Sequence, residues 1–351
     1  MKIIHTADVH LGASPDMGYP WEAQRCASLW YTFRNLVDVV KSENADLFVI
    51  SGDLFHANPT IQQLKEVDYL FSQIPQTVVV MCAGNHDHMG DKNPYADFDW
   101  SPNVIGLWNG ELQSVSVPRK NARVYGLSYY SNEAEEDLYA NARKCGNEKY
   151  HILLLHGGDA THSPLKRERL AAMDFDYIAM GHIHKPGYVI KNKAAYCGAL
   201  SPIDKNDVGE HGYICVNLND EGADVRFVQF APYKYEDLDI YCDGKDTLVS
   251  VEEKIRTQVE EKGEENSYRL KVHGGGFDVK RLVLRELWRY GKILDIEDDT
   301  HPDEDLDELC RKYRGTILEE YINALKARND DVGAYALKEG IEAILEAMGR
   351  S

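Results

Sequence analysis

The sequence predicts an α/β protein, and three observations support this class. In the first half, short apolar runs alternate with stretches that place apolar residues at helical spacing, as at residues 23–44 and 60–73. Each short run has the length, and the closing Gly or polar residue, of a buried strand. More strand-like runs follow up to about residue 230, and the composition changes after residue 235. Alternating strands and helices indicate sheets covered by helices.

Five of the strand-like runs end in residues that commonly bind metal ions. The runs are IIHTADVH, LFVISGD, VVVMCAGNHD, ILLLHG and YIAMGHIH, and their candidate ligands are Asp8, His10, Asp53, Asn85, His156, His182 and His184. The carboxyl ends of the strands lie along one edge of an open α/β sheet, and binding sites form at that edge. The five runs therefore predict one shared metal centre.

The candidate ligands are imidazole, carboxylate and amide groups, without a thiolate. This mixture suits manganese, iron or zinc and disfavours a structural zinc site. Seven ligands are too many for one ion and fit two ions that share a bridging carboxylate, which we assign to Asp53. Two divalent ions can activate water and stabilise the attacking and leaving oxygens of a displacement at phosphorus.

Two residues after Asn85 are predicted to act in catalysis. His86 is expected to face the substrate and to donate a proton or a hydrogen bond to the leaving oxygen. Asp87 is expected to orient the His86 ring, as carboxylates near metal sites commonly do. Three further residues, which could line a substrate groove or be ordinary rim or core residues, are Tyr129, Tyr130 and His162.

The motifs DVH, GDLFH, GNHD, LLHGG and GHIHKP resemble those of the calcineurin-like metallophosphoesterases over roughly the first 200 residues. HTADVHLG, Pro59 after GDLFH, and YCGALSP from Tyr196 to Pro202 are similar to the SbcD-type nuclease subunit of a double-strand-break repair complex, including shorter bacterial DNA repair exonucleases. The resemblance implies a four-layer αββα sandwich of two mixed sheets. It also implies that His56 lies near the active site and is linked to exonuclease action.

The resemblance further implies how two manganese ions divide the ligands. One ion would be held by Asp8, His10, Asp53 and His184, and the other by Asp53, Asn85, His156 and His182. His86 would be the catalytic histidine.

Three parts are expected along the chain. Residues 1–235 would form the nuclease domain, residues 236–300 a small α/β cap domain, and residues 301–351 an acidic linker and helical tail. Within the cap, a helix is expected to follow the Gly274–Gly276 turn and to run to Tyr290, and the run EDDTHPDEDLDE is expected to be a solvated linker. In the family, a helical segment at the place of the tail docks on the coiled coil of an SMC-like ATPase of the SbcC type. Packing of the tail on its own cap domain is the alternative.

The charge balance is unusual for a protein that acts on DNA. The formal net charge is −19, whereas nucleic-acid-binding proteins usually present a basic surface. Local basic residues, which could equally be ordinary solvated side chains, are Arg119, Lys120, Arg123, Lys166, Arg167, Arg169 and Lys185. Either an ATPase partner supplies much of the grip on DNA, or the substrate is small.

The expected location is the cytoplasm. The chain has no apolar stretch approaching the roughly 18 residues of a membrane helix, and no signal peptide precedes the first strand. Its seven scattered cysteines are typical of buried thiols in a reducing compartment. No membrane partner is therefore expected.

The combined prediction is a manganese-dependent DNA repair nuclease, a hydrolase of phosphodiester bonds that is expected to be an exonuclease and to work beside an SMC-like ATPase. Homodimerisation through helices of the first half is implied by the resemblance alone. Two alternatives stay open. One is a phosphatase or cyclic-nucleotide phosphodiesterase, and the other is a non-catalytic scaffold that recruits the ATPase.

Overall fold

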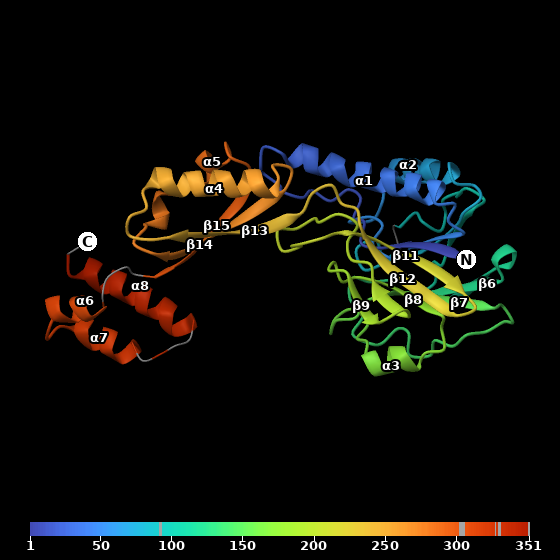
Figure 1. Ribbon diagram of the computed structural model, residues 1–351. Helices are drawn as coiled ribbons and strands as arrows, with labels where there is room; N and C mark the ends of the chain where they lie inside the picture. The colour runs from blue at the N-terminus through green and yellow to red at the C-terminus, as the bar shows by residue number, and fades with distance from the viewer. Residues whose placement is uncertain (91–92, 302–305, 327, 329–330, 350–351) are drawn as a thin grey trace. The chain divides into compact units, whose positions relative to one another are not determined.

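A computed structural model describes residues 1–90, 93–301, 306–326, 328 and 331–349 (Figure 1). The chain divides into two compact units, Met1–Lys234 and Tyr235–Ser351. Within the described ranges, no helix combines the length and apolar character that a membrane crossing needs.

The first unit contains two six-stranded sheets. The first sheet consists, in spatial order, of β12 (Gly222–Gln229), β11 (Gly212–Asn219), β1 (Lys2–Thr6), β2 (Leu47–Ser51), β3 (Val78–Cys82) and β4 (Val104–Gly106). Strands β1 to β4 are parallel, and β11 is antiparallel to both β1 and β12. The four parallel strands therefore present their carboxyl ends at one edge.

The second sheet repeats this pattern of parallel strands with antiparallel neighbours. It consists, in spatial order, of β5 (Gln113–Val117), β6 (Ala122–Gly126), β7 (Tyr150–His156), β8 (Tyr177–Gly181), β10 (Ala194–Tyr196) and β9 (Gly187–Ile190). Strands β6, β7, β8 and β10 are parallel, and β5 and β9 are antiparallel edge strands. A short 3-10 helix, Pro118–Lys120, joins β5 to β6.

Helices cover the outer faces of the two sheets, and an apolar core lies between them. Phe33 of α1 (Glu22–Ser42) and Phe71 of α2 (Ile61–Ser72) pack with Phe48 on the first sheet. Leu170 of α3 (Arg167–Ala172) packs on the outer face of the second sheet. Aliphatic side chains of both sheets fill the space between them, among them Val49, Val80, Ile152 and Leu154. The predicted four-layer αββα sandwich is confirmed.

The second unit begins with three parallel strands, β13 (Tyr235–Cys242), β14 (Ser267–Gly275) and β15 (Lys292–His301). Helix α4 (Leu248–Lys262) buries Val251, Ile255 and Val259 against them. The predicted helix up to Tyr290 is wrong: a 3-10 turn (Val279–Arg281) and the short α5 (Leu284–Leu287) replace it. The reason is local, because Leu282 and Val283 between them adopt extended backbone angles.

The acidic run that was expected to be a linker is in part a strand. Strand β15 continues through Glu297 to His301, and His273 of β14 binds Asp299 at 2.7 Å. Basic side chains on β14 thus offset the acidic residues that made the run look solvated. The next residues of the predicted linker, 302–305, lie outside the described residues.

The chain then forms three helices, α6 (Leu306–Lys312), α7 (Ile317–Leu325) and α8 (Asp331–Ala347). Their apolar stripes share one cluster, in which Leu318 and Ile322 of α7 pack with Leu309 of α6 and Ile341 of α8. The helical C-terminal segment predicted from the sequence is therefore present.

Candidate metal centre

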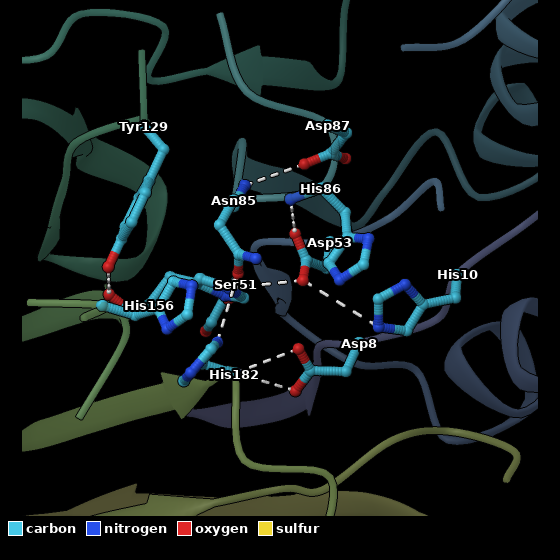
Figure 2. A network of polar contacts seen from close by, with 12 residues as sticks. Asp8, His10, Ser51, Asp53, Asn85, His86, Asp87, Tyr129, His156 and His182 are labelled. Atoms are coloured by element: carbon cyan, nitrogen blue, oxygen red, sulfur yellow. Dashed lines mark hydrogen bonds and ion pairs between the residues drawn. The ribbon is translucent and has the colours of Figure 1, made fainter. Parts of the chain in front are cut away.

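The candidate ligands come together at the carboxyl ends of strands from both sheets (Figure 2). Asp8, Asp53 and Asn85 follow β1, β2 and β3 of the first sheet. His156 is the last residue of β7, and His182 directly follows β8, in the second sheet. The site thus lies where the edges of the two sheets meet, and neither sheet alone could supply it.

The backbone at the ligand positions is unusual. Asp8, His10, Asp53 and His182 have φ angles of 49°, 51°, 51° and 95°. Non-glycine residues in such conformations cost of the order of 1–3 kcal/mol each and are typically kept where function requires them. The main-chain N–H groups of Val9 and His10 hold the turn after β1 by donating to the carbonyl of Asp53 at 2.9 and 3.1 Å.

One group of donors gathers around His10 and His184. Their Nε2 atoms lie 3.0 Å apart, and Oδ2 of Asp53 lies 3.9 Å from Nε2 of His10. A carboxylate oxygen of Asp8 lies within 4.8 Å of donor nitrogens of both histidines. Two ligands bound to one ion at about 2.1 Å each, in neighbouring positions, are about 3 Å apart. This spacing fits an ion between His10 and His184.

A second group gathers around Asn85. Its Oδ1 lies 2.9 Å from Nε2 of His156 and 3.1 Å from Nδ1 of His182. Oδ2 of Asp53 lies 3.4 Å from the same Nε2 of His156. Asp53 therefore reaches both groups through one oxygen atom, as its assignment as the bridge requires. Asp8 also holds the second group in place, because both of its carboxylate oxygens accept the main-chain N–H of His182 at 2.9 Å.

The protonation pattern of His156 tests whether a cation fits this second group. Its Nδ1 donates to the carbonyl of Ser51 at 2.8 Å, so a neutral ring has no hydrogen on Nε2. The lone pair of Nε2 then faces Oδ1 of Asn85 and Oδ2 of Asp53, which are also acceptors. Burial lowers the pKa of His156, but the charge and hydrogen bond of Asp53 outweigh it and raise the pKa to about 9. A site that attracts a proton this strongly also suits a divalent cation, so the residues present fit the metal.

The two carboxylates of the centre differ in their ionisation. Burial raises the pKa of Asp8 to about 6. Burial also opposes ionisation of Asp53, yet the charge of His156 and its hydrogen bond keep the pKa of Asp53 below the usual range. Asp53 is thus an anion in the middle of the donor set, which is where a bridge between two cations is needed.

Three groups that the sequence analysis did not identify orient the histidines. The carbonyl of Ser51 holds His156, a carboxylate oxygen of Asp159 lies 2.8 Å from Nε2 of His182, and Asp207 lies 3.1 Å from Nδ1 of His184. Asp159 is the last residue of the motif HGGD, which begins with His156, so the motif offered a signal for it. Asp207 lies 23 residues after His184 in a loop, and no spacing rule points to it.

His86 and His56 lie at the exposed rim of the centre. Nδ1 of His86 donates to the carbonyl of His56 at 3.1 Å, and the two rings stack with centroids 5.0 Å apart. The His86 ring also contacts that of His10 edge-on, with centroids 4.8 Å apart. His86 therefore stands beside the ligands, with Nδ1 bound to the main chain.

The expected role of Asp87 is wrong. Its carboxylate is fully buried and accepts hydrogen bonds from the N–H groups of Gly84 and Phe55 and from the hydroxyl of Tyr95. Asp87 thus fixes the loop that carries Asn85, and the carbonyl of His56 takes over the task of holding the His86 ring. The reason is steric and local, since the side chain of Asp87 points into the core while that of its neighbour points to the surface.

The three residues considered for a substrate groove have different surroundings. Tyr129 is buried, and its hydroxyl donates to the carbonyl of His156 at 3.0 Å, so it supports the wall of the centre. Tyr130 is exposed. His162 binds Asp159 through Nδ1 at 2.9 Å.

The basic residues noted in the sequence are partly neutralised by ion pairs. Lys120 pairs with Asp46, and Arg169 pairs with Asp137. Arg123 binds Glu148 at 2.8 Å. These clusters therefore offer less free positive charge than the sequence suggested.

Comparisons with known proteins agree with this geometry. A family model described as calcineurin-like phosphoesterase matches residues 1–186. The chain is 27% identical over 252 residues to the "Uncharacterized metallophosphoesterase YhaO" of Bacillus subtilis, covering 65% of this chain and 60% of that protein. It is 25% identical over 272 residues to the D subunit of the SbcCD nuclease of Staphylococcus epidermidis, covering 67% of this chain and 71% of that protein.

A solved structure, that of TT1561 of Thermus thermophilus, matches with a TM-score of 0.35 and 11% identity, over 64% of this chain and 98% of that one.

Proposed function

Because the chain belongs to the calcineurin-like phosphoesterase family, whose model matches residues 1–186 of 351, we propose that it is a dimetal-dependent DNA nuclease that hydrolyses phosphodiester bonds and works beside an SMC-like ATPase. The observation that most directly supports a hydrolase is the position of Asp53, because one of its oxygens faces both donor groups. The family accounts for metal-dependent hydrolysis of phosphoesters, and the choice of DNA as substrate is our proposal.

The two donor groups would hold one ion each. The first would be held by Asp8, His10, Asp53 and His184, and the second by Asp53, Asn85, His156 and His182. Two divalent ions bound there supply charge stabilisation at phosphorus and lower the pKa of an attacking water. The oxygen and imidazole donors suit manganese, with iron and zinc as the other candidates.

In this proposal, His86 assists the leaving group. The carbonyl of His56 can only accept, so Nδ1 of His86 keeps its hydrogen, and in the doubly protonated ring Nε2 carries a second hydrogen that the ring can give up. In the reaction a hydroxide, formed from water that has lost a proton to solvent, would bond to phosphorus through its oxygen. The bond from phosphorus to the sugar oxygen would break, and the Nε2 proton of His86 would pass to that sugar oxygen, leaving a neutral ring that regains a proton from solvent. A general acid of this kind contributes about 10²–10⁴-fold in rate.

Two observations support DNA as the substrate. The match to a protein named as part of a nuclease covers 67% of this chain, which is more than the 186 residues of the phosphoesterase match. His56 also stands at the rim beside His86, where the family places a histidine linked to exonuclease action. Both rings are exposed, so a substrate can reach them from solvent.

The ATPase partner is supported by the helical tail. Helix α8 carries an apolar stripe that includes Leu337, Ile344 and Leu345, and these residues are only partly buried by the tail itself. A coiled coil would bury such a stripe further. Homodimerisation stays a prediction from the family resemblance.

A small-substrate phosphatase or cyclic-nucleotide phosphodiesterase is the second candidate. It is favoured by the formal net charge of −19 and by the ion pairs that neutralise Lys120, Arg123 and Arg169. Phosphate contacts supply most non-specific affinity for DNA, so a protein with few free cations gains little from a polymeric substrate.

One experiment separates these functions. End-labelled duplex DNA, single-stranded DNA, an aryl phosphodiester and an aryl phosphomonoester are each incubated with the full chain in manganese, magnesium or chelator. A DNA nuclease shortens labelled DNA with manganese and not with chelator. Activity on the small esters alone would favour the second candidate. No activity on any substrate, with both ions bound, would favour the non-catalytic scaffold.

A further inference from the structure

Each histidine of the GHIH motif is held by its own carboxylate. Nδ1 of His184 lies 3.1 Å from both carboxylate oxygens of Asp207. Nε2 of His182 lies 2.8 Å from Oδ2 of Asp159. The two carboxylates come from different loops and approach the two rings at different nitrogens.

In both rings, the nitrogen away from the carboxylate faces the metal centre. Nε2 of His184 lies 3.0 Å from Nε2 of His10, and Nδ1 of His182 lies 3.1 Å from Oδ1 of Asn85. A carboxylate accepts, so the ring nitrogen bound to it carries a hydrogen. The opposite nitrogen is then left with its lone pair directed at the centre, as a metal ligand requires.

Both carboxylates are themselves fixed by main-chain groups. Asp207 accepts the N–H groups of Ile203 at 3.0 Å and Asp204 at 3.2 Å, and its side chain is only 12% exposed. Asp159 accepts the N–H groups of Thr161 and His162 at 2.9 Å. Its side chain is 45% exposed. Each loop therefore holds its carboxylate in one position, and Asp207 is the more buried of the two.

We propose that Asp207 and Asp159 are positioning residues that control different ions: Asp207 acts through His184 on the ion beside His10, and Asp159 acts through His182 on the ion beside Asn85. This inference rests on the proposed dimetal hydrolase and goes beyond it, because it assigns one carboxylate outside the ligand set to each ion. Loss of such a partner typically weakens metal binding about 10–100-fold.

The test measures manganese binding and needs no activity assay. The metal-free full chain is titrated with Mn²⁺ while free Mn²⁺ is followed by electron paramagnetic resonance, for wild type, Asp207→Asn, Asp159→Asn and the control Asp204→Asn. Asp204 is an exposed carboxylate in the loop of Asp207, so its change removes the same charge without touching a histidine ring. We expect two ions in wild type and in the control, and one ion weakened about 10–100-fold in each of the other variants.

Double variants identify which ion each carboxylate controls. In His184→Ala, which keeps the ion beside Asn85, adding Asp207→Asn should change nothing, and adding Asp159→Asn should weaken the remaining ion about 10–100-fold. In His182→Ala, adding Asp159→Asn should change nothing, and adding Asp207→Asn should weaken binding of the remaining ion. Thermal melting of the metal-free proteins shows whether each variant folds. If Asp207→Asn does not fold, Asp207→Glu, which keeps the charge and displaces the carboxylate, is expected to weaken the same ion.

Several results would overturn the inference. One is an equal weakening of manganese binding at both sites in Asp207→Asn. Another is a further loss of manganese affinity when Asp207→Asn is added to His184→Ala. The third is a third bound ion in wild type that Asp159→Asn removes. Wild type that binds fewer than two ions would overturn the dimetal hydrolase itself, and this result is seen before any carboxylate is changed.

Discussion

The main-chain N–H of His86 donates a hydrogen bond of 2.9 Å to Oδ1 of Asp53. This bond occupies one carboxylate oxygen, and the other, Oδ2, lies 3.9 Å from Nε2 of His10 and 3.4 Å from Nε2 of His156. A single aspartate therefore joins the proposed general acid to both donor groups. The position of the acid and the position of the bridge are set by the same side chain.

Replacing His86, the proposed general acid, should lower turnover without removing the metal ions. In His86→Ala, turnover of a phosphodiester is expected to fall about 10²–10⁴-fold. Both ions should remain, because the side chain of His86 contacts ligand rings without belonging to either donor group. Turnover and bound manganese per chain are measured on the same preparation. A parallel loss of metal would assign His86 to the ligands instead.

Replacing the bridge should remove both ions. In Asp53→Asn, the negative charge that faces His10 and His156 is lost, while the N–H bond from His86 can still be accepted. We expect bound manganese to fall well below one ion per chain and turnover to disappear, as measured by elemental analysis and a phosphodiester assay. Retention of one ion at wild-type affinity would show that Asp53 serves a single site.

A methyl group at Gly84 should displace the bridge. A Cβ at this position would lie 2.2 Å from Oδ1 of Asp53 and 2.7 Å from Nε2 of His156, too close for either atom to stay in place. Gly84→Ala is expected to weaken manganese binding strongly. Gly187, which begins β9 shortly after His184, has open space around its Cβ position and provides the matched control. Equal metal binding in Gly84→Ala and Gly187→Ala would contradict the geometry.

The buried carboxylate of Asp87 should depend on Tyr95 for stability. The Tyr95 hydroxyl donates to Asp87 at 2.6 Å, and both side chains are almost completely buried. Tyr95→Phe leaves a buried acceptor without this donor and should lower the free energy of unfolding by about 1–3 kcal/mol. In the control Tyr150→Phe, the lost bond to Asp220 is exposed at 3.3 Å, so little change is expected. Urea unfolding of the metal-free proteins measures both, and similar losses would argue against the role given to Asp87.

Acid should destabilise the fold in part through His5. Burial lowers the pKa of His5 to about 3, whereas the unfolded chain has the ordinary value of 6.5. The neutral ring, whose Nδ1 contacts the Tyr177 hydroxyl at 2.8 Å, therefore favours the folded state above pH 6.5. This contribution is lost as the pH falls from 6.5 toward 3, at up to about 1.4 kcal/mol per pH unit.

The measurement compares wild type with His5→Asn in chelator by urea unfolding between pH 7 and pH 4. The variant lacks the titrating ring, so the difference in the free energy of unfolding between the two proteins should shift in favour of the variant as the pH falls. A difference that stays constant with pH would mean that His5 does not titrate in this way.

The fold class and the ligand types could be predicted because both depend on local patterns. Apolar spacing placed α1 and α2 within one or two residues of their observed bounds, and the polar residues that end β1, β2, β3, β7 and β8 lie at one edge as parallel strands require. Strand β15 was missed because its acidic residues look solvated in sequence, and only pairing with β14 explains them.

The roles of particular side chains could be predicted less well. Asp87 carries a carboxylate, which could orient the His86 ring, and its position directly after His86 in the sequence suggested that role. The tertiary structure instead directs it toward Gly84, Phe55 and Tyr95. Neighbours in sequence can point to opposite sides of a loop, so adjacency alone does not establish contact.

The sequence by itself determined that this protein has an α/β fold and which side chains are available as metal ligands, because strand length, apolar periodicity and ligand chemistry are properties of short segments. Only the tertiary structure decided that one oxygen of Asp53 faces both donor groups, and that Asp159 and Asp207 hold the two histidines of GHIH. The physical reason is that hydrogen-bond partners are selected by distance and direction in space. The packing of two sheets and the course of their loops set these quantities, and no spacing along the chain records them.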